Sequence, residues 1–291
     1  MSQNIKDRLR SLLVTGIQTP GQYIGGELGA VVKDHAAVRG KLCLAFPDAY
    51  SIGMSHHGFQ VLYHLMNQRD DWVCERAFAP WPDMEELLRR EELPLYGLET
   101  GTPLLEFDVV GFTMQYELCA TNLLTMLDLG RIPIHAEDRS LNDPLVTAGG
   151  PQAFVPEPMA PFIDLFVIGD GEEMLGRVCD AWLEAKSTST DREEALLKLA
   201  TTLPHVYVPR FYRVDESRGG PLGPLVPTRD DVPTEIHPAV VRLEDIPIVT
   251  RPILPMVECV QERITIELMR GCPWTCKFCQ SSVIKHPVRF R

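Results

Sequence analysis

Residues 108–129 read DVVGFTMQYELCATNLLTMLDL and show the folding pattern of the chain most clearly. The first part, residues 108–114, is an apolar run with the length of a β-strand. The second part, residues 116–129, places apolar side chains on one helical face: Leu123, Leu124, Met126 and Leu127. A strand that leads directly into a helix is the repeating unit of α/β folds.

The same unit recurs on both sides of this stretch. Apolar runs of strand length occupy residues 42–46, 144–148 and 165–168, and helical patterns follow from His57 and over residues 172–185. The last two runs end in glycines, which is typical of parallel strands covered on both faces. We therefore predict a Rossmann-like, doubly wound parallel sheet over residues 40–187, with ligands bound beyond the carboxyl ends of its strands.

Different patterns flank this predicted domain. Residues 1–39 combine an amphipathic stretch at 5–13 with a Gly-rich loop at 20–27. Residues 188–262 form a proline-rich linker, in which we expect one helix at 191–199 and a hairpin between 205–209 and 211–214. Residues 263–291 begin with a strand-like run at 263–269.

Composition narrows the classes of function. The chain has 291 residues, of which 45% are apolar and 23% charged, and its net charge of −12 argues against long surfaces for nucleic acid or anionic membranes. The sequence has no apolar run of membrane-spanning length and no signal-peptide core, so we expect a cytoplasmic protein and no membrane partner.

Seven of the eight cysteines fall into two groups. Cys43, Cys74, Cys119 and Cys179 stand singly in apolar segments, as buried free thiols do. Three others cluster in residues 271–279, GCPWTCKFC, with the spacing CxxxCxxC. Three thiolates can hold one corner of a compact metal centre, and they are one fewer than a closed tetrahedral site takes. A structural zinc loop is the alternative, but His286 downstream lacks the partner spacing of a zinc finger.

Residues 264–291 resemble the first strand and cluster loop of radical S-adenosylmethionine (SAM) enzymes. The resemblance implies that Cys272, Cys276 and Cys279 hold a [4Fe-4S] cluster whose fourth iron binds SAM, and that Phe278 lies by the SAM adenine. One electron then cleaves the sulfonium, and the 5′-deoxyadenosyl radical abstracts hydrogen from a substrate. Because the catalytic domain of that family is an α/β barrel, we expect a chain truncated early in this domain and inactive by itself.

The loop after the first expected strand is similar to the DxHxxG signature of cobalamin-binding domains. Asp48 and Gly53 are in register, while Tyr50 replaces the histidine that would ligate cobalt. Thr113 and the pair Gly149-Gly150 stand where that domain often has a serine and two glycines. Radical SAM enzymes with such a domain commonly lack the histidine, so Tyr50 neither excludes nor supports cobalamin. With cobalamin bound, methyl transfer would be the natural reaction.

Nearly the whole chain resembles an uncharacterised family of B12-binding-domain radical SAM proteins, on segments 23–27, 46–48 and 169–172. The resemblance implies an oxidoreductase or transferase with an unknown substrate and a reductive electron donor such as flavodoxin or ferredoxin. The competing hypothesis is a non-catalytic module that binds a metal or docks a partner and carries a vestigial cobalamin-type domain.

Several of these positions also have structural interpretations. Asp48, Tyr50 and Gly53 fit an ordinary helix-entry turn, and His56 with His57 fits a helix N-terminus better than a metal site. The segments 149–151 and 169–173 fit strand-to-helix turns, and neither contains GxGxxG or a Walker loop. The basic tail has two interpretations, attraction of an anionic donor or substrate and a solvated rim; it comprises Lys277, Lys285, Arg289 and Arg291.

Overall fold

A six-stranded sheet forms the centre of the molecule in the computed structural model, which describes residues 5–13, 16–261 and 263–291. The strand order is β2-β1-β3-β4-β5-β6, and all neighbours are parallel except β5 and β6. The order of the five parallel strands is that of flavodoxin-like doubly wound sheets. The strands are β1 (Gly40–Phe46), β2 (Trp72–Phe78), β3 (Val109–Thr113), β4 (Leu145–Gly149), β5 (Leu165–Val167) and β6 (Val206–Tyr207).

Helices connect these strands. The crossover helix α3 (His57–Asn67) leads from β1 to β2, α4 (Pro82–Arg90) leads back toward β3, and α5 (Ala120–Leu129) leads to β4. The helix α6 (Met174–Thr188) follows β5 and packs beside α3, where Gly176 faces Met66. The helix α7 (Arg192–Thr202) packs on α6 and leads to β6. The predicted mixed α/β architecture with a largely parallel sheet is therefore confirmed.

The sheet extends beyond the segment expected from the sequence. The expected boundary at residue 187 falls inside α6, and both α7 and β6 follow it. The expected hairpin is wrong: β6 pairs with β5, whereas β7 (Tyr212–Val214) pairs with β8 (Leu225–Pro227). The reason is burial, because pairing with β5 buries both Val206 and Tyr207 at the end of the sheet.

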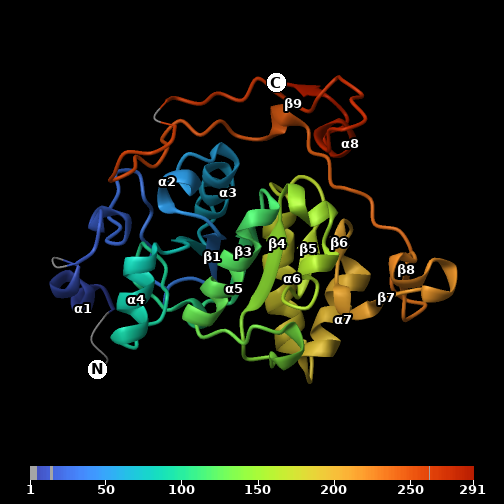
Figure 1. Cartoon of the computed structure of the whole chain (residues 1–291), viewed down its shortest axis with the longest axis horizontal. Coiled ribbons are helices and arrows are strands. Elements are labelled where there is room, and N and C mark those ends of the chain that lie inside the picture. Colours follow the sequence, from blue (N-terminus) through green and yellow to red (C-terminus); the bar gives the residue numbers. More distant parts are fainter. Residues whose placement is uncertain (1–4, 14–15, 262) are drawn as a thin grey trace.

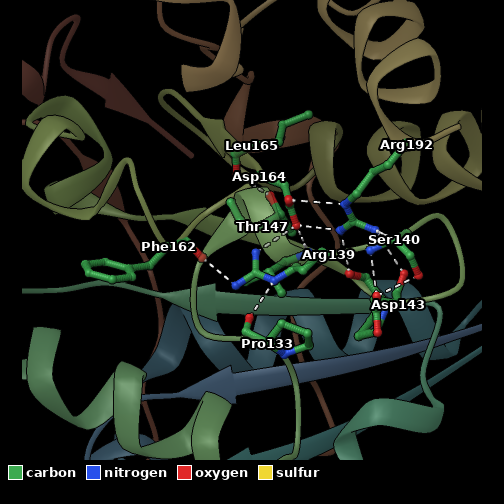
Figure 2. Close-up of polar contacts among 12 residues, drawn as sticks. Pro133, Arg139, Ser140, Asp143, Thr147, Phe162, Asp164, Leu165 and Arg192 are labelled. Carbon is green, nitrogen blue, oxygen red and sulfur yellow. Dashed lines mark hydrogen bonds and ion pairs between the residues drawn. The ribbon is translucent and has the colours of Figure 1, made fainter.

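A buried ionic network joins α7 to the start of β5 (Figure 2). The Asp164 carboxylate accepts from Arg192 at 2.7 Å, from Arg139 at 3.0 Å and from the backbone N–H of Val146 at 2.8 Å. The remaining guanidinium N–H groups donate to backbone carbonyls, including those of Pro133 and Phe162. The three charged side chains are almost completely buried, so the network fixes α7 and the loop before β4 to the sheet.

The outer edge of β2 is covered by side chains and by a neighbouring loop. The Asn67 amide donates to the carbonyl of Cys74 at 2.9 Å and accepts from its N–H at 3.2 Å. The N–H of Arg76 donates to the Glu99 carboxylate at 2.8 Å, and the N–H of Leu98 donates to the carbonyl of Arg76 at 2.8 Å. Backbone groups of this edge strand therefore have partners within the chain.

The terminal segments lie around this domain. The N-terminal segment contains α1 (Ile5–Leu12), and α2 (Tyr50–Gly53) is a single turn after β1. The chain after β8 runs without long elements, as expected of the linker, and passes over one end of the sheet as the orange and red segment in Figure 1. No helix of the described residues has the length and apolar character to cross a bilayer.

The C-terminal segment forms a small ribbon in place of the expected barrel strand. Of residues 263–269, only the last belongs to a strand, β9 (Met269–Arg270), which pairs antiparallel with β10 (Arg289–Phe290). The short helix α8 (Ser281–Ile284) lies between them. The expected boundary at residue 262, like residues 1–4 of the N-terminal region, lies outside the described residues.

Candidate functional site

A cavity of about 360 Å³ lies at the carboxyl ends of the parallel strands. Its floor includes Thr113 of β3, Gly149 of β4 and Val167 of β5, and one wall is the N-terminal turn of α3. Glu267, Arg270 and Lys285 complete it from the C-terminal segment, which passes over this end of the sheet (Figure 1). The cavity thus lies where doubly wound sheets bind ligands, and it is bounded by the segment that carries the clustered cysteines.

Thr113, Gly149 and Gly150, three of the residues singled out from the sequence, line this cavity. Gly150 has a φ of +97°, and a Cβ there would lie 2.6 Å from the carbonyl oxygen of Met114. Only glycine fits this turn without strain, which lets the backbone form the cavity surface directly.

Asp48, Tyr50 and Gly53 do not line it. The Tyr50 hydroxyl donates to Glu27 at 3.1 Å and accepts from the N–H of Met256 at 3.1 Å. Burial, followed by the neighbouring Glu27 carboxylate, raises the pKa of Tyr50. The hydroxyl therefore stays protonated and is occupied by structural contacts.

The other two residues of that signature serve the turn after β1. Asp48 accepts from its neighbour Ala49 at 2.7 Å and also accepts from the hydroxyl of Tyr116. A Cβ on Gly53 would lie 2.3 Å from the ring of Phe78, so this glycine allows close packing. Their environment is that of a helix-entry turn.

The histidine pair lies at the N-terminus of α3, and both residues line the cavity. His56 is the N-cap, and its Nδ1 accepts from the N–H of Phe59 at 3.1 Å. Burial lowers the pKa of both His56 and His57, so the two rings are neutral near pH 7. The expectation of a helix N-terminus is confirmed.

A buried charge network near Tyr50 has no counterpart in the sequence analysis. Arg76 of β2 donates to Glu27 at 3.0 Å and to Glu99 at 2.6 Å, and all three side chains are buried. The Gly-rich loop around residue 27 thus supplies a counter-ion to the sheet. The sequence signal for this network was the pair Glu75 and Arg76, which stands within an otherwise apolar run.

Ion pairs hold the cysteine ribbon onto the strand-to-helix turn after β5. Arg270 of β9 donates to Asp170 at 2.9 Å and to Glu172 at 2.6 Å. Arg289, its register partner in β10, also donates to Asp170 and to the carbonyl of Val241 at 2.9 Å. The turn at residues 169–172 therefore anchors both strands at the base of the cysteine loop.

The loop between these strands carries the three clustered cysteines. Gly271 has a φ of +110°, and a Cβ there would lie 2.6 Å from the carbonyl oxygen of Lys285. The N–H of Cys272 donates to the same carbonyl at 3.3 Å. The Ser282 hydroxyl is 2.7 Å from the carbonyl oxygens of both Cys276 and Cys279. Backbone contacts therefore close the loop at its base and at its helical end.

Exposure divides the cysteines as the sequence suggested. Cys272, Cys276 and Cys279 are half-buried, and the others are buried: Cys43, Cys74, Cys119, Cys179 and Cys259. In the part of the chain that the structure describes, no three His, Cys, Asp or Glu side chains are gathered as the ligands of one metal ion. Phe278, expected beside the SAM adenine, is 93% exposed.

Comparison with known proteins identifies the domain beneath the cavity. A family model described as "Radical SAM proteins, N-terminal" matches residues 58–209, which is more than half of the chain. The matched range runs from α3 to just beyond β6, and the cysteine loop lies outside it. No curated protein and no solved structure matches the chain. From the family match, we conclude that the chain belongs to the radical SAM proteins and carries their N-terminal domain.

Proposed function

We propose that this chain is the N-terminal part of a radical SAM enzyme in which Cys272, Cys276 and Cys279 bind a [4Fe-4S] cluster. The observation that carries the proposal is the attachment of the CxxxCxxC ribbon to the cavity of a radical SAM N-terminal domain through Asp170, Arg270 and Arg289.

The donor set fits such a cluster. Three thiols lie within eight residues of one half-exposed loop, whereas the nearest other cysteine in sequence, Cys259, is buried. Thiolates are the preferred ligands of iron–sulfur clusters, and three of them leave one iron open. The chemistry that a bound cluster supplies is the one-electron reductive cleavage of SAM, which yields methionine and a hydrogen-abstracting 5′-deoxyadenosyl radical.

The residues of the chain have supporting roles in this proposal. Gly271 and Ser282 shape the loop, and the arginine pair fixes its base over the cavity. The exposed Phe278 would contact the adenine of SAM. The exposed Lys277 would attract an anionic electron donor such as flavodoxin or ferredoxin. The reaction class is oxidoreductase or transferase.

Anaerobic reconstitution with iron and sulfide tests this proposal. The wild-type chain should take up iron and inorganic sulfide and gain the broad visible absorbance of a cluster, and Cys272→Ala should lose both. Cys259→Ala is the matched control, since this thiol is buried outside the loop. Zinc bound in place of iron, or equal iron uptake by Cys272→Ala, would favour the non-catalytic metal-binding module instead.

A corrinoid cofactor is a second candidate for the N-terminal domain. It is favoured by the flavodoxin-like strand order and by the position of Thr113, Gly149 and Gly150 at the cavity. Because the Tyr50 hydroxyl is occupied by Glu27 and Met256, this chain would bind a corrinoid without a tyrosine ligand to cobalt. Incubation with hydroxocobalamin and gel filtration test it: loss of all corrinoid from the protein peak rejects this candidate.

A further inference from the structure

The cavity beneath the cysteine ribbon is lined by one basic side chain, Lys285, that takes no part in the ion pairs holding the ribbon. Its three carboxylates, Asp170, Glu172 and Glu267, all accept from Arg270, and Asp170 also accepts from Arg289. These acids are therefore turned toward guanidinium groups. The Lys285 side chain lines the same cavity, and within the described residues its ammonium makes no ion pair and no hydrogen bond.

A second polar group of the cavity also lacks a partner. Thr113 is only 8% exposed, and within the described residues its hydroxyl makes no hydrogen bond. A neighbouring threonine, Thr147, satisfies its own hydroxyl by donating to the carbonyl of Leu165 at 2.9 Å. Because Thr113 lines the cavity, its unbonded hydroxyl is available to donate a hydrogen bond to a ligand there.

The remaining surface of the cavity suits an apolar body. Aliphatic and aromatic side chains from the sheet and the helices form much of it: Leu44, Val61, Leu62, Phe112 and Leu175. The volume of about 360 Å³ is within the range of small-ligand sites. The N-terminus of α3 adds backbone N–H groups at His57 and Gly58, whose partial positive charge favours an anion.

We propose that this cavity binds an organic anion, with its carboxylate or phosphate paired to Lys285 and its apolar body against the sheet between α3 and α6. Thr113 supplies a further hydrogen bond to the ligand. Because Lys285 belongs to the cysteine ribbon and Thr113 to β3, the ligand contacts both parts of the molecule at once. This site is separate from the cysteine ligands and does not depend on a bound cluster.

Two fluorescent dyes test the proposal on the metal-free protein. The probe is 1-anilinonaphthalene-8-sulfonate, and the matched neutral compound is N-phenyl-1-naphthylamine, which lacks the sulfonate. The variants are Lys285→Gln and Thr113→Val. The control is Lys277→Gln, which removes an exposed lysine of the same loop that does not line the cavity.

The expected result is one sulfonate dye bound per chain, with an affinity lowered about tenfold or more by Lys285→Gln, as loss of a charge-assisted contact predicts. Thr113→Val should weaken it by a smaller factor, and Lys277→Gln should not. Binding of the neutral dye should be equal in wild type and Lys285→Gln. Equal affinity of the sulfonate for wild type and Lys285→Gln would overturn the proposal.

Displacement of the sulfonate dye then distinguishes the two chemical classes of anion, phosphate and carboxylate. Adenosine 5′-monophosphate represents phosphates and 3-phenylpropionate represents carboxylates. Displacement by one of them assigns the class of anion, whereas a dye displaced by neither would overturn the site. A failed cluster reconstitution would leave this dye result unchanged, so the two proposals fail separately.

Discussion

Asp170 and Arg270 lie 100 positions apart in the sequence and are joined by a hydrogen bond of 2.9 Å. Arg289, which faces Arg270 across the ribbon, donates to the other carboxylate oxygen of Asp170. One carboxylate therefore holds both strands at the base of the cysteine loop. The turn after β5 thus acts as the anchor for the part of the chain that carries the clustered thiols.

Removing the charge of Asp170 should release the ribbon. In Asp170→Asn, amide hydrogen exchange over residues 268–291 should become faster because both arginines lose a charged acceptor, while exchange in β3 and β4 should stay slow. Glu173→Gln is the matched control, since this neighbouring acid is exposed. Unchanged exchange in the ribbon of Asp170→Asn would show that other contacts hold it.

The same anchor should fail in acid. Burial alone would raise the pKa of Asp170, but hydrogen bonds from Arg289 and Arg270 outweigh burial and hold this pKa below its ordinary value. A lowered pKa means that the contribution to stability is present above about pH 4 and is lost as the pH falls through the lower folded-state value. Exchange in the ribbon should therefore depend on Asp170 at pH 7, and this dependence should shrink as the pH falls below about 4, after correction for intrinsic rates.

Asp164→Ala should destabilise the domain strongly. The change leaves the guanidinium groups of Arg139 and Arg192 buried without a counter-ion, which costs about 3–5 kcal/mol. Urea denaturation followed by circular dichroism measures this free energy of unfolding. The exposed pair of Arg229 and Asp231 provides the comparison, because solvent screens this pair and Asp231→Ala should change the free energy of unfolding far less. Equal losses in the two variants would contradict the role of the buried network.

Tyr50→Phe should weaken folding without changing the cavity. Removing the hydroxyl leaves the buried Glu27 carboxylate and the N–H of Met256 each without one partner, at a cost of roughly 1–3 kcal/mol in the free energy of unfolding. Because Tyr50 does not line the cavity, the affinity for the sulfonate dye should stay at the wild-type value. A loss of dye binding at unchanged stability would place Tyr50 in the ligand site instead.

His56 should make stability depend on pH near neutrality. Burial lowers the pKa of His56, so the unfolded chain binds a proton more readily than the folded chain. The stability contributed by the neutral ring is present above about pH 6.5 and is lost as the pH falls through the lower folded-state value. In His56→Asn, which keeps an N-cap acceptor, denaturation midpoints between pH 7.5 and 5.5 should change less than in wild type. The control, His237→Asn, replaces an exposed histidine and should retain the wild-type slope.

Much of the sheet was predictable because its strands are continuous apolar runs. The strands β1, β3, β4 and β5 fall within a few residues of the segments expected from the sequence. In contrast, β2 was missed, because Glu75 and Arg76 interrupt the apolar run that normally marks a buried strand. Their counter-ions and hydrogen-bond partners come from distant segments, such as His35 and Glu99, so no local pattern could reveal their burial.

The candidate site was predictable only in part. The similarity to cobalamin-binding domains indicated Thr113, Gly149 and Gly150, and these residues lie at the strand ends where ligands of parallel sheets bind. Local pattern could not show that Lys285 would line the same cavity as Thr113. These two residues come together only because the linker returns over the end of the sheet. Asp48 matched the cobalamin-domain signature and Tyr50 stood in place of its histidine, and both have partners away from the cavity.

The partners along the outer side of β2 have a consequence for the behaviour of the protein in solution. Free strand edges recruit identical strands from other molecules and so begin aggregation. Here the Asn67 amide mimics a neighbouring peptide against Cys74, and Glu99 occupies the N–H of Arg76. At these positions, the β2 side of the sheet offers no template to a second molecule, which protects the protein from self-association through that edge at high concentration.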